Sequence, residues 1–581
     1  MSYDGIDLQE GTLELPRRIT VGNEEGRAWF ARGWFHVINY NHEEAISCFA
    51  RSVQTDDMCL MAYWGTAYAS SSSYNLPIGL GCGYDSIQAA IAGLEEAEEG
   101  VYSKLEKDLI YALAARSTAE SKAAMNPADM NFGNPPELNV RFAEEMSKVY
   151  ANYQDDLDVA AIYAESLMVL KPWALWVKDE STGAVSPADE NTLIAKRVLT
   201  RAMELHGGMK HPAVLHLFIH LMELSAEPTT AMAAANTLRN LLPAAGHLTH
   251  MASHIDIWAG HYKEALATNI TSIKTDFATV RYCGAESNFY KVYRIHNIHM
   301  AVWSAMFTGQ KEIAMRYARV IESILPPGDS NSGIQAVLLG AIKLGRCYLE
   351  PYTTTKWHVM VRFGMWDEIL SEPQYEDKDL YASGVAAGYY ARGLAFAVKG
   401  LIPEAEDEQT KYVEFIEDPA FEGRQMNINM LMTKEGPSIL EIGVSMLAGE
   451  IEYRKGNFKV AFDHLREAVR LDMGLMYEEP WAWMVPAAHA LGALLLEQGQ
   501  VREATEVFRS DLEKYKDNMW GLLGLYQCLQ QAGDPEAAEV KQRFDEAAAM
   551  ADQKPAATCF CAKVTGASSP KAAPNGCCRP K

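Results

Sequence analysis

Apolar residues recur at every third or fourth position through most of the 581-residue chain, and sustained alternation of β-branched with polar residues is nearly absent. Spacing of three and four places apolar side chains on one face of an α-helix, whereas alternation places them on one face of a strand. The pattern therefore predicts an all-α structure.

One short signal recurs inside these helical patterns: a glycine followed, after four residues, by an alanine. Glycine suits the tight turn after a helix because a positive φ costs it little, and alanine lets the next helix pack closely. Each occurrence predicts a helical hairpin. The signal occurs at Gly260/Ala265, Gly309/Ala314, Gly400/Ala405, Gly456/Ala461, Gly499/Ala504 and Gly533/Ala538, while Tyr40 replaces the glycine before Ala45 and Ile369 replaces the alanine after Gly364.

The clearest hairpins are LEIGVSMLAGEIEYRKGNFKVAFDHLREAVRLD (440–472), LGALLLEQGQVREATEVFRSDLEKYKDN (491–518) and GLLGLYQCLQQAGDPEAAEVKQRF (521–544). They resemble the tetratricopeptide repeat, and Gly499 and Gly533 have the 34-residue period of that family. The resemblance implies a solenoid of helical hairpins. Elsewhere the glycines are irregularly spaced, so we expect long insertions in the solenoid.

The chain divides into six expected segments. After residue 550 it becomes rich in Pro, Ala, Ser and Lys and poor in large apolar residues, so we expect a disordered tail. The four cysteines of this tail (Cys559, Cys561, Cys577, Cys578) match no closed zinc motif. The segments are an N-terminal extension (1–26), divergent helical repeats (27–205), histidine-rich helices with a metal site (206–310), further divergent repeats (311–439), regular repeats (440–550) and the tail (551–581).

The formal net charge of −24 argues against a nucleic-acid partner, because such surfaces need clustered Lys and Arg. No apolar run of about eighteen residues is present, so we expect no membrane span. Six cysteines are scattered singly, as in a reducing compartment. We therefore expect a cytoplasmic protein.

Ten of the 15 histidines fall between His206 and His299. In HPAVLHLFIHLMELS (211–225), Pro212 is well placed as the first residue of a helix with His211 as its cap. Within that helix His216, His220 and Glu223 share one face, because they are spaced at i, i+4 and i+7.

Two further helices repeat this arrangement. GHLTHMASHIDIWAGH (246–261) carries His247, His250 and His254 on one stripe, and RIHNIHM (294–300) carries His296 and His299 one turn apart. Imidazole is the commonest neutral metal ligand, and pairs one turn apart direct two nitrogens to one point. A single buried histidine is usually satisfied by a hydrogen bond, but three paired faces predict a shared metal site.

The predicted ligands are His216, His220, His250, His254, His296 and His299, with Glu223 as a further ligand or the acid/base residue, and with His42, His211 and His247 close by. Ligand softness leaves Cu, Fe and Zn open. Six histidines exceed the needs of one ion. We therefore expect a dinuclear copper or iron centre, with a single zinc ion surrounded by spare histidines as the alternative.

The three histidine stretches also resemble a histidine-rich family of tetratricopeptide-repeat proteins from bacteria and fungi, as do NHEEAISCF (41–49), YAESLMVLKPWALW (163–176) and EEPWAWMVPAAHALGALLLEQG (478–499). This resemblance covers most of residues 27–550. It implies a repeat fold and carries hardly any chemistry. It also implies that His42 and Glu43 approach the same cavity as the other histidines.

Two functions of different classes follow from these patterns. The first is a metal-dependent oxidoreductase that uses dioxygen and acts on a small organic molecule. The second is a scaffold that binds a protein or peptide in the groove of the solenoid without catalysis. Tightly bound metal in the purified protein would favour the first.

Overall fold

The computed structural model describes residues 19–563, except 78, 126–132, 180–181, 284–288, 326–348, 379–380, 418–438 and 553, together with residues 2–3 and 6–7. Almost all of the regular structure in these ranges is helical, as predicted. The strands form two short antiparallel pairs, β1 (Ser2–Tyr3) with β2 (Ile6–Asp7) and β3 (Trp176–Lys178) with β4 (Val185–Pro187). The helices run along the whole chain.

The helices are α1 (Glu24–Ile38), α2 (His42–Thr55), α3 (Leu60–Ser70), α4 (Tyr84–Glu96), α5 (Lys104–Ala114), α6 (Ala119–Ala124), α7 (Pro136–Asn152), α8 (Leu157–Met168), α9 (Glu190–Glu204), α10 (Pro212–Met222), α11 (Met232–Leu238), α12 (Gly246–Ala259), α13 (Tyr262–Cys283), α14 (Lys291–Phe307), α15 (Lys311–Ile324), α17 (Thr355–Arg362), α18 (Trp366–Ser371), α19 (Ala382–Val398), α20 (Ile402–Ile416), α21 (Ile439–Arg454), α22 (Phe458–Gly474), α23 (Ala487–Glu497), α24 (Val501–Lys514), α25 (Met519–Ala532), α26 (Ala537–Ala547) and α27 (Phe560–Lys563). Short 3₁₀ helices are η2 (Gly208–Lys210), η3 (Pro228–Ala231), η4 (Glu350–Thr354) and η6 (Ala548–Met550).

The glycine-to-alanine signal marks the turns of helical hairpins, as predicted. Helices that flank such a turn pack on each other, as in the pairs α1/α2, α12/α13, α21/α22 and α25/α26. The alanine is fully buried in five of the six hairpins, and Ala538 in the last hairpin is exposed. All six predicted turn glycines have positive φ: Gly260 (80°), Gly309 (71°), Gly400 (78°), Gly456 (84°), Gly499 (74°) and Gly533 (71°).

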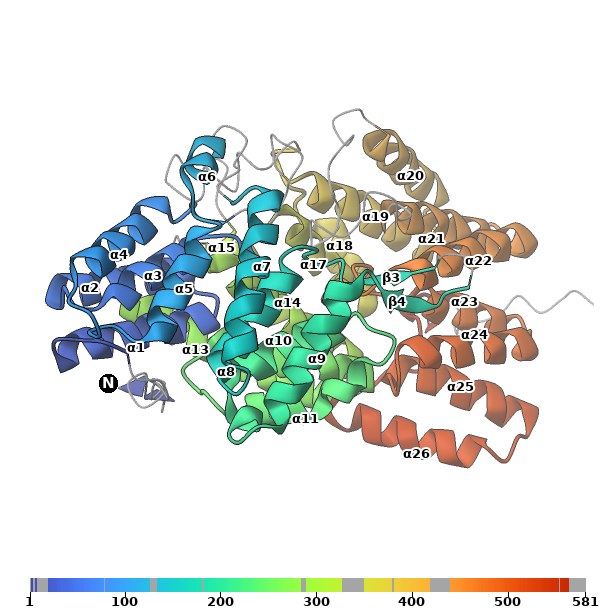
Figure 1. The fold of residues 1–581 in the computed structure, drawn as a ribbon. Helices are drawn as coiled ribbons and strands as arrows, with labels where there is room; N and C mark the ends of the chain where they lie inside the picture. Colours follow the sequence, from blue (N-terminus) through green and yellow to red (C-terminus); the bar gives the residue numbers. More distant parts are fainter. Residues whose placement is uncertain are drawn as a thin grey trace, which may run out of the picture.

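The hairpin array folds back on itself. Figure 1 shows the N-terminal helices α1 to α5 at one end, the C-terminal helices α21 to α26 at the other, and the green helices α10, α13 and α14 between them. The indole Nε1 of Trp520 in α25 donates to the carbonyl of Met306 in α14 at 2.9 Å. At the other end, the amide of Leu248 donates to the Asn39 side chain at 3.3 Å. The histidine-rich helices therefore lie between the two ends of the chain.

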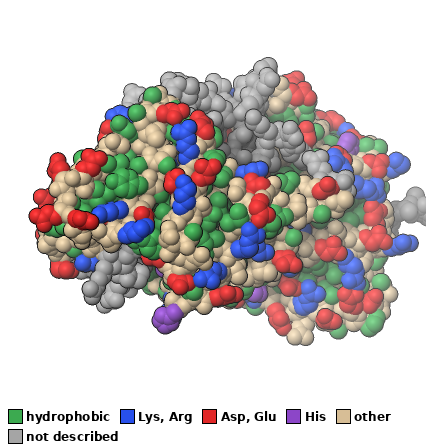
Figure 2. All heavy atoms as spheres, viewed as in Figure 1, with side chains coloured by type: hydrophobic (Ala, Val, Ile, Leu, Met, Phe, Trp, Pro, Cys, Tyr) green, Lys and Arg blue, Asp and Glu red, His purple; other side chains and the backbone are tan. Residues whose placement is uncertain are grey.

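The burial of the helices differs along the array. Every residue of α10 is buried, and so is every residue of α12 from Gly246 to Ile257. The outer helices have a solvated face, where blue and red side chains are intermixed in Figure 2. One continuous apolar core extends from Ile19 to Cys561. Within the described ranges, we find no helix that is both long and apolar enough to cross a membrane.

The ordered chain continues past the boundary predicted at residue 550. Thr558, Phe560 and Cys561 are buried, and α27 packs against α23. The Arg362 guanidinium donates to the carbonyl of Thr558, so a buried cation fixes this segment. The rest of the predicted tail, including Cys577 and Cys578, lies outside the described residues.

Candidate metal centre

Six buried histidines from α10, α12 and α14 form two groups of three. In each group, one nitrogen of every ring lies within 4.8 Å of the others. The first trio is His216, His220 and His247, and the second trio is His250, His254 and His296. The rings of the two trios are in contact, with centroids 5.9 Å apart between His247 and His250 and 6.0 Å apart between His220 and His254. The three helices thus converge as the sequence predicted.

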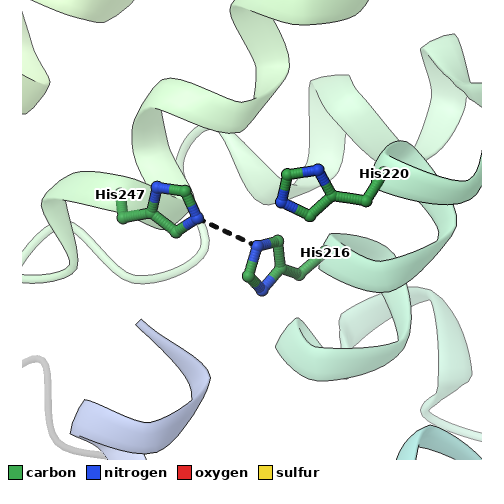
Figure 3. A group of neighbouring side chains, drawn as sticks. All are labelled: His216, His220 and His247. Atoms are coloured by element: carbon green, nitrogen blue, oxygen red, sulfur yellow. Dashed lines mark hydrogen bonds between the residues drawn. The ribbon is translucent and has the colours of Figure 1, made fainter. Parts of the chain in front are cut away.

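In the first trio, the Nε2 atoms of His216 and His247 lie 3.1 Å apart (Figure 3). The ring of His220 is 4.9 Å from that of His216 on the same helix. The Nδ1 atom of His247 is buried without a hydrogen-bond partner among the described residues. A buried polar atom without a partner is uncommon in proteins, and a bound ion can supply the partner that such an atom lacks.

In the second trio, the Nε2 atoms of His250 and His254 lie 2.8 Å apart. Nδ1 of His250 donates to the Asn269 side-chain oxygen at 2.7 Å, and the Asn269 amide is oriented by its own bond to Ala265 at 2.8 Å. The proton of His250 is therefore on Nδ1, which leaves the lone pair of Nε2 directed at His254. Such a fixed tautomer is typical of a metal-ligating imidazole.

The nitrogen separations match those of two ligands on one ion. With metal–nitrogen bonds of about 2.0 to 2.1 Å, two ligands at a right angle are about 2.9 Å apart, and two at the tetrahedral angle about 3.4 Å apart. The observed distance between Nε2 atoms is 3.1 Å in the first trio, which lies in this range, and 2.8 Å in the second trio, which lies just below it.

Two carboxyl groups lie between the trios. Glu223 is 2.7 Å from Nδ1 of His220 through Oε1 and 2.6 Å from Nδ1 of His254 through Oε2. The contact with His254 lacks hydrogen-bond geometry, since Oε2 has no hydrogen-bond partner. Glu479 is 4.0 Å from Nδ1 of His220 and 3.5 Å from Nε2 of His296. Each of the two carboxyl groups therefore lies close to one histidine in the first trio and one in the second.

Burial controls the protonation of the whole cluster. Desolvation lowers the pKa of the His216 imidazole to about 3 and lowers the pKa values of the other five rings. Desolvation also raises the pKa of Glu223 well above its usual range, against a smaller opposite effect from a hydrogen bond to Glu479. At neutral pH the imidazoles are neutral, which is the form that binds metals.

Two of the predicted residues lie away from the trios, and a third, His42, is close enough to His216 to lower the pKa of its imidazole. His211 caps α10 by accepting the amide of Val214 at 3.4 Å, as predicted, and its Nε2 lies 3.2 Å from Asp158. His299 is buried but belongs to neither trio, and its ring faces Tyr352 at 5.3 Å. His42 is buried at the start of α2, 5.5 Å from the ring of Tyr40.

Sequence reasoning gave no role to Glu479 and Tyr477 and placed His247 only nearby. Tyr477 OH lies 3.2 Å from Nδ1 of His254, and Tyr477 and Glu479 both belong to the segment between α22 and α23. Glu479 has a φ of 62°, an uncommon conformation for a residue with a side chain. In the sequence, the stretch 478–499 stands out only for its resemblance, and the pair of acidic residues before Pro480 is the signal in it that could have indicated a role at the site.

A further group of metal-ligand type lies in the first hairpin. It consists of His36, Glu44 and Cys48, which are less deeply buried than the trios. The pKa of the His36 imidazole is lowered to about 4 by burial and by the positive charge of Arg32. A guanidinium this close would also repel a cation, so this group is a weaker metal site than the trios.

A small cavity shares the segment between α22 and α23 with the histidine cluster. It is lined by His358, Tyr390, Ala482 and Trp483, among others, and its volume is about 20 Å³. The Tyr390 hydroxyl and the Trp483 Nε1 are buried without hydrogen-bond partners among the described residues. A space of this size holds about one water molecule, so an organic ligand would have to displace side chains.

No protein-family model and no curated protein matches the chain. The human IFIT1 dimer with m7Gppp-AAAA is similar at a TM-score of 0.30 and 12% identity, over 92% of this chain and 97% of that one. The Cut9–Hcn1 hetero-tetramer of the APC/C is similar at a TM-score of 0.27 and 12% identity, over 90% and 94% of the two chains. Scores this low carry no argument about ligands or partners.

Proposed function

We propose that this protein is a metalloprotein with a dinuclear centre, in which the first trio binds one ion and the second trio binds the other. Glu223 and Glu479 would be further ligands, because each lies beside a histidine of both trios and their ligand atoms lie within 4.8 Å of one another and of His220. The observation that carries the proposal is the close approach of Nε2 atoms in both trios, at 3.1 Å and 2.8 Å, in a site without solvent exposure.

The cost of burying these polar groups favours bound metal over a purely structural role. Six buried imidazoles and two buried carboxyl groups are costly to desolvate, and hydrogen bonds among them leave Nδ1 of His247 and Oε2 of Glu223 unpaired. Two ions would supply partners for these atoms. Without ions, Glu223 and Glu479 must share a proton, because two carboxylates at hydrogen-bond distance do not both ionise in a buried site.

The mixture of ligands favours iron. Imidazole suits iron, copper and zinc alike, whereas carboxylate is a hard ligand that suits iron better than Cu(I). Copper and zinc remain distinct outcomes of the metal analysis below.

Redox chemistry is the reaction class that we propose for this centre, as an oxidoreductase that uses dioxygen and acts on a small organic molecule. The cavity beside Trp483 is lined by no residue of either trio, so the reaction class rests on the ligand set and not on this cavity. The cytoplasmic location and the organic substrate stay predictions from the sequence.

A scaffold that binds a protein or peptide is the second candidate, because arrays of helical hairpins commonly present a concave surface. It requires no metal. The two candidates therefore differ in what the purified protein contains.

Metal content tests the proposal. The untagged protein, purified without chelators, should hold about two ions per chain by elemental analysis, since each trio provides one complete set of nitrogen ligands. His216→Ala and His250→Ala should each lower the content by at least one ion. His261→Ala is the matched control, because His261 is exposed in the turn after α12. A metal-free wild type, which also takes up no iron, copper or zinc on dialysis, would leave the scaffold as the function.

A further inference from the structure

Tyr40 occupies a turn position that other hairpins give to glycine. It lies between α1 and α2 with a φ of 55°, whereas the corresponding glycines have φ values from 62° to 84°. A bulky side chain is strained in this conformation, and such residues cluster at functional sites. Contacts of the Tyr40 side chain with its surroundings must therefore stabilise this backbone conformation.

The ring of Tyr40 lies on the first trio. Its centroid is 4.5 Å from that of His216 and 5.3 Å from that of His247, and the side chain is buried. No closer ring contact to the first trio comes from outside it among the described residues. The strained turn therefore brings a phenol into contact with two of the proposed metal ligands.

The hydroxyl of Tyr40 donates a hydrogen bond to Oε1 of Glu165 in α8 at 3.2 Å. Glu165 is fixed in place by two further donors, the hydroxyl of Tyr68 and the amide of Tyr74, the latter at 3.5 Å. A carboxylate that accepts these bonds is oriented to take the phenolic proton of Tyr40 without moving.

We propose that Tyr40 is a redox-active tyrosine of the metal centre and that Glu165 is its proton acceptor, an inference that rests on the proposed dinuclear site. In this step the O–H bond of Tyr40 would break: the proton would form an O–H bond on Glu165, and the electron would leave through the contact with His216. A neutral tyrosyl radical and a neutral carboxylic acid would remain. An ion held by the first trio would accept the electron, with dioxygen as the external oxidant.

Packing alone does not account for the arrangement. A phenylalanine at position 40 would fill the same space in the small cluster of Leu76, Phe289, Tyr290 and Tyr293 that surrounds the ring. Only the hydroxyl reaches Glu165, so replacing Tyr40 with phenylalanine separates the packing from the proposed chemistry.

The test is electron paramagnetic resonance of the full-length protein, loaded anaerobically with Fe(II) and then exposed to dioxygen. Wild type should give a tyrosyl radical signal near the free-electron g value, which narrows when the protein contains ring-deuterated tyrosine. Tyr40→Phe should lose at least nine-tenths of that signal while it keeps its iron. Glu165→Gln, which removes the ionisable proton acceptor, should lower the radical yield several-fold.

One tyrosine provides a matched control. Tyr293 contacts His247 from another side, with ring centroids 4.9 Å apart. Tyr293→Phe should keep at least half of the signal. If Tyr40→Phe does not fold, the deuterated wild type and Glu165→Gln decide the question.

The outcomes separate the two proposals. Protein that binds no iron, copper or zinc overturns the dinuclear site and this inference together. Protein that binds iron but gives no tyrosyl signal, or whose signal survives in Tyr40→Phe, overturns this inference and leaves the metal site intact.

Discussion

The histidine-rich helices and the C-terminal hairpins use the same structural unit in different ways. In α24 only Ala504, Phe508 and Asp511 are buried, and the opposite face carries exposed ion pairs such as Arg466 with Glu503. In α12 every residue from Gly246 to Ile257 is buried, including three histidines. The first region is mostly apolar inside and charged outside, and its buried Asp511 is paired with His489 and Asn518. The second places polar groups inside, which costs stability unless they share partners.

The comparison indicates where stability and function reside. The C-terminal hairpins are held by apolar contacts, so substitutions there should change unfolding and leave the metal content unchanged. Substitutions of the trio histidines should lower the metal content and change the unfolding of the metal-free protein less. The predictions below test that separation.

Phe508→Ala should destabilise the protein by about 3 to 5 kcal/mol, because the fully buried ring lies against Gly492 and Gly524 and its removal leaves a cavity. Chemical denaturation with circular dichroism measures the loss. Metal content per folded chain should not change. Phe458→Ala, at a phenylalanine that is 39% exposed, is the matched control and should cost much less. Loss of metal in Phe508→Ala would contradict the expected separation between residues that determine stability and residues that bind metal.

Each bound ion should stabilise the wild type by about 2.7 kcal/mol when free metal exceeds its Kd by about 100-fold, since the ions bind the folded chain in preference to the unfolded one. The comparison of thermal unfolding with metal and with a chelator measures this gain. A chain with both His216→Ala and His250→Ala should show almost none of it. An equal gain in stability with metal in the wild type and in the double variant would show that metal binds outside the two trios.

The metal-free protein should lose stability as pH falls from about 6.5 towards 3. The unfolded chain binds protons at its histidines below their usual pKa of 6.5, whereas burial holds the pKa of folded His216 and His299 at about 3. Each such histidine costs about 1.4 kcal/mol per pH unit in that window. Burial raises the pKa of several carboxyl groups, which act in the opposite direction as pH rises above their usual pKa: Glu43, Glu223, Asp256, Asp276 and Asp472. The histidines whose pKa burial lowers outnumber them. Denaturant midpoints between pH 4 and 7 check the slope, and a flat profile would contradict this account of burial.

His299→Met should change stability by less than about 1 kcal/mol at neutral pH and leave both ions bound. Both ring nitrogens of His299 are buried without hydrogen-bond partners among the described residues, so an apolar replacement of similar size removes an unsatisfied group. The variant should also flatten the acid slope slightly. Loss of an ion in His299→Met would instead return His299 to the ligand set expected from the sequence.

The sequence predicted the features that depend on local spacing. The turn glycines, the His211 cap of α10 and the shared face of His216, His220 and Glu223 follow from helix geometry within one or two turns. Spacing could not show that His296 belongs to a trio and His299 does not. Residues three apart on a helix point only about 60° away from each other, so both were expected as ligands.

The long-range parts of the centre could not be predicted from spacing. The histidines of α12 form one stripe in the sequence, yet the structure divides them between the trios, with His247 in the first and His250 and His254 in the second. Glu479 is distant in the sequence from Glu223 and approaches it only because the C-terminal hairpins fold back on α14. Tyr40 stands out in the sequence as a departure from the turn glycine, but its contact with His216 depends on how α1 and α10 pack.

Anomalous X-ray diffraction from crystals of the untagged protein, collected on either side of the absorption edge of the metal found by elemental analysis, is the most direct test of the dinuclear centre. The account predicts two anomalous peaks, one among His216, His220 and His247 and one among His250, His254 and His296, with Glu223 and Glu479 between them. The absence of peaks at both trios, in crystals soaked with that metal, would contradict it.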